Sequence, residues 1–198
     1  MKPSLRSNSS RAIAIASAVI LMAGCTPPKK APAPTPISKH PTPTSQCPPK
    51  YPQHYANAAL HYSICLPKNV TKGSVAGLPA GSVEFEGFSV PAGTNLTSKR
   101  LIIHPGSEAL LQSATPFGQF TTAGGVTLQR VKATDAGAGH QFLNIIYVWK
   151  HAGHQLNFVF EHRSVNAGIV GPPEPAVYNE AAQVHITEEI MKTLRFQP

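Results

Sequence analysis

The stretch from Val126 to Arg163, VTLQRVKATDAGAGHQFLNIIYVWKHAGHQLNFVFEHR, carries the strongest secondary-structure pattern in the chain. Its outer parts alternate apolar and polar residues, and its middle part is rich in β-branched and aromatic residues. Such patterns are typical of strands, and Gly-rich pairs and clusters between them are typical of turns. The predicted strands cover 126–134, 141–150 and 155–163, and the predicted turns cover 135–139 and 152–153. Three antiparallel strands in a meander follow.

Shorter strands are predicted before this meander. They cover 60–66, 82–90 and 100–104, and each ends at a proline or a Gly/Pro turn. In the second, Val83 and Phe85 alternate with Glu84 and Glu86, which we expect on the solvated face of the strand rather than as paired catalytic carboxylates. Ser107 is expected to cap a short helix that ends at Gln112.

The C-terminal part predicts helical structure over 179–193, as one helix or two short ones. Thr187 is a suitable N-cap residue, because Glu188 and Glu189 follow it and Lys192 lies near the end. A last short strand is expected over 194–196. The sequence therefore predicts an α+β fold with one domain, residues 51–198. That domain is mainly an antiparallel sheet with a central β-meander and a C-terminal helix.

The first 25 residues have the layout of an export signal. Lys2, Arg6 and Arg11 form a basic head, and residues 12–24 are uncharged and mostly apolar. This run of about 13 residues is shorter than the roughly 20 residues that a spanning helix needs. A signal that is cleaved is therefore favoured over a retained anchor.

The end of this segment, Leu21-Met22-Ala23-Gly24-Cys25, resembles the lipobox of bacterial lipoproteins. The resemblance implies cleavage after residue 24 and a lipid on Cys25 that binds the membrane. Thr26 stands where Asp would commonly retain such a protein in the inner membrane, so the resemblance implies the outer membrane, facing the periplasm. Simple secretion is the alternative.

Residues 25–50 are rich in Pro, Ala, Thr and Lys, which is typical of an extended polyproline II spacer. Residues 26–46 alone can span up to about 65 Å. The sequence is thus divided into a signal (1–24), a lipidated cysteine with a Pro-rich linker (25–50) and a folded domain (51–198). A Pro-rich ligand for a partner is a second interpretation of the linker.

The formal net charge of +8 does not indicate a nucleic-acid-binding protein. Seven of the basic residues precede residue 51, and the domain has ten Lys and Arg against nine Asp and Glu. A nucleic-acid-binding domain needs a basic face, which this balance does not supply. We therefore expect no nucleic-acid partner.

The two cysteines after Cys25 form an even pair. In an exported protein Cys47 and Cys65 are expected to form a disulfide, with free buried thiols as the alternative. The bridge would attach the end of the linker to the first predicted strand and stabilise the fold by about 3 kcal/mol.

The hairpin sequence His151-Ala152-Gly153-His154 is the densest histidine feature. A two-residue turn places His151 and His154 opposite each other, so they are weak candidate metal ligands, with Glu161 as a third candidate. Zinc normally takes three or four protein ligands, and exposed turn histidines are the favoured interpretation. No metal and no cofactor are expected.

No catalytic constellation is evident. Asp135, the only Asp, lies in a predicted turn, and no G-x-S-x-G motif is present. The remaining candidates for function are binding features: the stiff loop Gly171–Pro175 and the lone Trp149. We therefore expect a protein that is not an enzyme.

The segments Tyr62-Ser63-Ile64-Cys65-Leu66-Pro67 and Ile190-Met191-Lys192-Thr193-Leu194-Arg195-Phe196 resemble the opening strand and the closing helix and strand of PsbP-like and Mog1-like domains. The resemblance would cover residues 60–197, and it implies a binding or assembly scaffold. The expected function is a lipid-anchored envelope protein with a binding or assembly domain and an envelope protein as partner. The alternatives are a metal-binding protein or enzyme that uses the His151/His154 hairpin, and a small-ligand carrier with an apolar pocket between helix and sheet.

Overall fold

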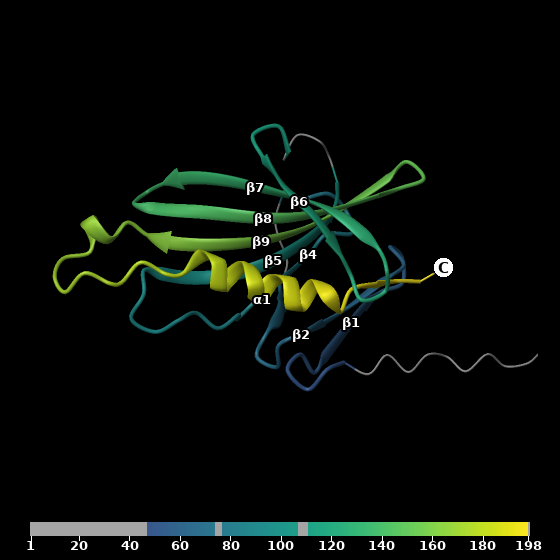
Figure 1. The fold of residues 1–198 in the computed structure, drawn as a ribbon, viewed down its shortest axis with the longest axis horizontal. Helices are drawn as coiled ribbons and strands as arrows, with labels where there is room; N and C mark the ends of the chain where they lie inside the picture. Colours follow the sequence, from purple (N-terminus) through teal and green to yellow (C-terminus); the bar gives the residue numbers. More distant parts are fainter. Residues whose placement is uncertain (1–46, 74–76, 107–110, 198) are drawn as a thin grey trace, which may run out of the picture. The chain divides into compact units, whose positions relative to one another are not determined.

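The structure is a computed structural model and describes residues 47–73, 77–106 and 111–197. These residues form an α+β domain that is mostly antiparallel sheet (Figure 1). The seven-stranded sheet has the order β3-β4-β5-β9-β8-β7-β6, and the three-stranded sheet has the order β1-β2-β10. The elements are β1 (Gln53–Asn57), β2 (Tyr62–Leu66), β3 (Thr71–Gly73), β4 (Val83–Glu86), β5 (Leu96–Pro105), β6 (Thr115–Thr121), β7 (Thr127–Gly137), β8 (His140–His151), β9 (His154–Val165), a 3-10 turn (Ala167–Ile169), α1 (Glu180–Lys192) and β10 (Arg195–Phe196). The signal, Cys25 and nearly all of the linker lie outside the described residues.

The predicted meander is confirmed as β7, β8 and β9. Both of its turns are Ala-Gly pairs with positive φ, 48° and 78° at Ala138-Gly139 and 47° and 79° at Ala152-Gly153. Two left-handed residues match the twist of the flanking strands and let pairing continue up to the turn. The predicted turn at 135–139 was therefore too long, because Gly137 already pairs with His140.

The main core lies on one face of the seven-stranded sheet, and α1 and the three-stranded sheet cover that face. Phe158 and Phe160 of β9 pack there beside Tyr147 of β8. Tyr62 of β2 meets Phe158 with ring centroids 5.6 Å apart. Met191 of α1 is fully buried in the same cluster.

A smaller apolar cluster covers part of the opposite face of the sheet. Its buried members are Ile102, Val131, Ile146, Val148 and Val159. Side chains from the connections before β4 and β6 pack against it: Leu78, Leu111 and Ala114. The central strand β9 is thus buried on both faces over 156–160, which alternation alone does not predict.

The helical segment forms a single helix, α1. Its N-cap residue is Asn179, whose side-chain oxygen accepts a hydrogen bond from Ala182 N at 3.1 Å. The prediction that Thr187 caps a helix was wrong. Thr187 lies in the middle of the helix. Its hydroxyl donates a hydrogen bond to Val184 O and lies 3.1 Å from the Tyr147 hydroxyl, so it is not available to cap a helix.

The remaining predicted strands are confirmed as β2, β4, β5 and β10, with shifted ends. The strand expected at 82–90 stops at Glu86, because Gly87 has a φ of 87° and turns the chain. The strands β1, β3 and β6 were not predicted; they are short or mostly exposed edge segments. The short helix expected after Ser107 falls mainly outside the described residues. Within the described part of the chain, no helix is long and apolar enough to cross a bilayer.

Candidate functional site

The structure brings His151 and His154 together as predicted. They are directly opposite each other where β8 ends and β9 begins, and both are exposed. Glu161 lies seven residues along β9 and pairs with Asn144, so it is far from this turn. Residues 47–73, 77–106 and 111–197 contain no group of three or more His, Cys, Asp or Glu arranged to hold a metal ion.

Trp149 is a packing residue. Its ring stacks on Phe196 of β10 with centroids 4.2 Å apart and on His151 at 5.7 Å. These contacts join the meander to the C-terminal strand of the other sheet.

The disulfide between Cys47 and Cys65 is present, with Cα atoms 5.6 Å apart. It attaches the end of the linker to β2, as predicted. The hydroxyl of Thr193, just after α1, accepts a hydrogen bond from Cys65 N at 2.9 Å. The start of the domain is therefore anchored next to the C-terminal end of the helix.

The loop 166–179, between β9 and α1, contains the predicted segment Gly171–Pro175 and is largely exposed. Three apolar side chains before and after the segment Gly171–Pro175 are exposed to solvent: Ile169 is 66% exposed, Val170 40% and Val177 77%. The buried Asn95 holds the returning part of the loop. Its backbone N–H donates to Ala176 O at 2.8 Å, and its side-chain oxygen accepts from Tyr178 N at 3.0 Å.

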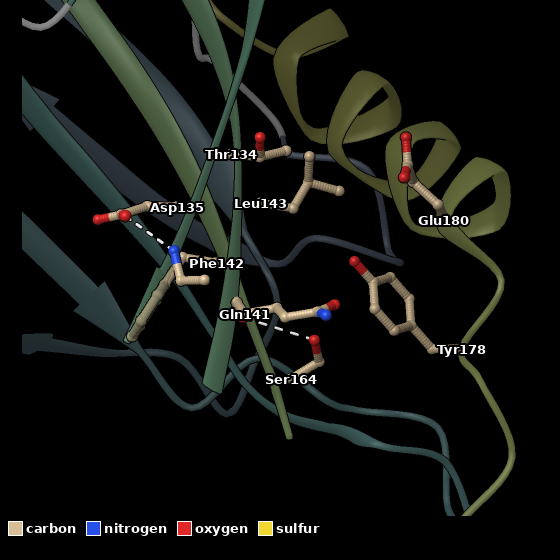
Figure 2. Close-up of a pocket in the computed structure, with 9 residues that line it drawn as sticks. Thr134, Asp135, Gln141, Phe142, Leu143, Ser164, Tyr178 and Glu180 are labelled. Carbon is tan, nitrogen blue, oxygen red and sulfur yellow. Dashed lines mark hydrogen bonds between the residues drawn. The ribbon is translucent and has the colours of Figure 1, made fainter. Parts of the chain in front are cut away.

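A recess of about 580 Å³ opens beside this loop, between the ends of β7–β9 and the start of α1 (Figure 2). Figure 2 shows the Tyr178 hydroxyl and the Glu180 side chain facing Leu143 and Gln141 across it, while Asp135 points away. The residues that line it are Thr134, Asp135, Ala136, Gln141, Phe142, Leu143, Ser164, Tyr178 and Glu180.

The polar groups of the recess are suited to hydrogen bonding with a ligand. The Ser164 hydroxyl donates to Gln141 O at 3.5 Å, and Glu180 forms an ion pair with Lys132. Burial, and secondarily the charge of Glu180, raises the pKa of Tyr178, so its hydroxyl remains a proton donor. Within the described residues, the Ser164 hydroxyl is thus bonded to a backbone carbonyl.

His162 lies beneath the first turn of α1, on the same face of β9 as Ser164. It is 1% exposed, and burial, with a smaller effect of Lys99, lowers its pKa to about 4. Lys99 itself donates to Gln183 of α1 at 2.9 Å, and burial lowers its pKa. His162 is therefore neutral at neutral pH and contributes packing beside the recess.

The prediction that both Glu84 and Glu86 lie on a solvated face was wrong for Glu84. Glu86 is exposed, but Glu84 is 5% exposed and accepts a hydrogen bond from Arg100 Nη1 at 2.8 Å. Arg100 also binds Glu161 with two bonds, of 2.8 and 3.1 Å. The face opposite α1 thus carries an ionic cluster of Glu84, Arg100 and Glu161.

The sequence did not predict Asn95, Arg100 or Tyr178 as positioning residues. Each acts through a partner distant in sequence: Asn95 through Tyr178, and Arg100 through Glu161. Local patterns carry no signal for such pairs, since they depend on the order of strands in the sheet.

No family model matches this chain. No curated protein matches it either. Among solved structures, a protein of Bacteroides thetaiotaomicron is similar with 12% sequence identity and a TM-score of 0.42, over 73% of this chain and 48% of that chain. The chain thus spans about half the length of that protein, and the likeness is too low to support an argument about function.

Proposed function

We propose that this chain is a lipid-anchored envelope protein whose domain faces the periplasm and binds a partner protein, without catalysis. The lipobox-like segment that ends at Cys25 supports the anchor, and the Pro-rich linker supports a spacer. The disulfide between Cys47 and Cys65 fits an oxidising compartment outside the cytoplasm.

The described end of the linker and the exposed loop meet α1 near its opposite ends. Near the C-terminal end, Glu189 accepts hydrogen bonds from Lys50 at 2.6 Å and from the Tyr51 hydroxyl at 3.0 Å, so the linker meets the domain there. The loop 166–179 leads into the N-terminal end (Figure 1). Glu189 lies nine residues after the first residue of α1, so this contact is about 14 Å from the end of the helix that the loop enters.

We name the exposed side chains Ile169, Val170 and Val177, together with the recess of Figure 2, the distal surface. Apolar side chains that project beside a polar recess match the composition of protein interfaces, with an apolar contact area and a polar rim. The exposure of Ile169 and Val177 at this end of the domain is the observation that carries the proposal.

Site-specific photo-cross-linking in the native host tests this function. A photoreactive residue at Val177 should give one discrete adduct with an envelope protein, and Ile169→Asp should reduce its yield. The control is the same residue at His54, which is exposed on β1. An equal pattern of adducts at both positions, or none at Val177, would contradict a specific distal interface.

A further inference from the structure

A second hollow, of about 540 Å³, lies on the opposite face of the seven-stranded sheet from α1. Its volume is within the usual range of small-molecule sites, about 300–1,000 Å³. The described residues that line it include Ile102, His104, Asp135, Ile146, Val159 and Glu161.

The strand register arranges this face in three rows. Glu161 lies opposite Arg100 on β5 and Asn144 on β8, which gives a polar row. The next row is aliphatic, because Val159 lies opposite Ile102 and Ile146. The third row is polar again, with His104 opposite Asn157. A ligand that follows the strands would therefore meet polar, apolar and polar groups in turn.

The ionic cluster beside the first row carries a net negative charge, with Glu84 opposite Ile102 on the neighbouring row. Arg100 supplies one positive charge to two carboxylates, those of Glu84 and Glu161, so the cluster sums to one negative charge. Asp135 lines the same hollow, whereas none of its described lining residues is Lys or Arg. A cationic group is therefore the complement of this end.

The third row holds one acceptor and one donor without partners. His104 is 2% exposed, and its Nδ1 lies 2.9 Å from Pro105 O, so Nδ1 carries the proton and Nε2 is an acceptor. Asn157 is fully buried, and its side-chain oxygen accepts from Gln155. Among the described residues, neither His104 Nε2 nor Asn157 Nδ2 has a hydrogen-bond partner. Of the two, His104 lines the hollow, and a hydroxyl or an amide N–H can donate to its Nε2.

We propose that this hollow binds a linear aliphatic amine that carries a hydroxyl or amide at its other end. The ammonium binds Glu161, the methylenes lie on Ile102 and Val159, and the far polar group meets His104. Four residues along a strand cover about 13 Å, and two hydrogen bonds leave about 8 Å between the ligand's end groups. A chain of five or six carbons spans that length. This site is independent of the proposed protein partner.

A series of matched compounds tests the inference on the full chain, purified from membranes in detergent micelles. The probes are 6-amino-1-hexanol, hexylamine, which lacks the hydroxyl, and 1,6-hexanediol, which lacks the charge. Binding is measured by NMR of ¹³C-labelled isoleucine methyl groups. Ile102 and Ile146 report on the hollow, while Ile103 and Ile145, their chain neighbours, face the main core and serve as internal controls.

The expected result is a saturable shift of the Ile102 and Ile146 signals with 6-amino-1-hexanol. Its affinity should exceed that of the diol by about tenfold or more, as expected for one charge-assisted hydrogen bond. Its affinity should also exceed that of hexylamine. Equal weak shifts with all three probes, or equal shifts of Ile103 and Ile145, would overturn the proposal.

Two variants assign the ends of the ligand. Glu161→Gln should abolish the preference for the amino alcohol over the diol, and His104→Leu should abolish its preference over hexylamine. Glu174→Gln, a charge removal at an exposed position of the loop 166–179, should leave both preferences unchanged. If a variant fails to fold, the probe series on the unaltered chain still decides, since it requires no substitution.

Discussion

At the residue scale, Arg100 is the central group of the ionic cluster opposite α1. Arg100→Met would leave Glu84 buried without its cation, and removal of one partner from a buried pair is strongly destabilising. Because Arg100 is itself partly exposed, we expect a loss of about 2 kcal/mol in the free energy of unfolding, measured by urea denaturation.

The matched control for Arg100 is Lys50→Met. It also breaks an ion pair, with Glu189, but Lys50 is exposed. Exposed pairs contribute little, so its effect should be much smaller than that of Arg100→Met. Equal effects of the two substitutions would contradict the structural role given to Glu84.

His162 predicts a pH dependence of stability. Its folded pKa of about 4 is below the ordinary value of 6.5, so the unfolded chain binds a proton that the folded chain does not bind between these values. The free energy of unfolding therefore falls as the pH drops from 6.5 to 4, by up to about 3 kcal/mol from this group.

The measurement is urea denaturation at pH 7 and pH 4.5. His162→Gln should lose less stability between these two values than the unaltered chain. His185→Gln, at an exposed position of α1, is the control and should keep the full loss. An unchanged pH dependence in His162→Gln would show that His162 does not cause it.

The chemistry of single residues could be predicted where it does not depend on the order of strands in the sheet. Cys47 and Cys65 were paired because few cysteines were available, and His151 and His154 were placed opposite each other from a two-residue turn. Glu84 was misplaced because its burial depends on Arg100 and Glu161, from strands whose order in the sheet the sequence does not state.

At the element scale, the N-terminal cap of α1 gives a direct test. Asn179→Ala removes the hydrogen bond to Ala182 N and should cost about 1 kcal/mol, whereas Asn179→Asp should retain most of the stability. Both are measured by urea denaturation at pH 7. Full stability in Asn179→Ala would contradict the assignment of the cap.

Strands with strong alternation of apolar and polar residues were predicted correctly, and strands with weak alternation were missed. The meander was predicted because its strands are long and its turns contain glycine, whereas β1, β3 and β6 were missed. For α1 the sequence analysis named Thr187 as the cap residue. The structure uses Asn179 because the Thr187 side chain is buried against Tyr147, a tertiary contact that overrides local preference.

At the scale of the whole molecule, the disulfide attaches the tether to the domain. It closes a loop with a sequence separation of 18, so its loss should cost about 3 kcal/mol. Urea denaturation of the chain with and without dithiothreitol measures this without any substitution, and Cys47→Ala with Cys65→Ala should agree. A reduced chain of unchanged stability would contradict this contribution.

In the proposed function, a lipid on Cys25 anchors the domain to the membrane, with the Pro-rich segment as spacer. Mass spectrometry of the N-terminal peptide, from chain purified out of the membranes of its own host, tests it most directly. We expect a mature chain that begins at Cys25 and carries a diacylglyceryl group on its sulfur, and a Cys25→Ser chain without lipid. A mature chain that begins elsewhere, or an unmodified Cys25, would contradict the proposed anchor.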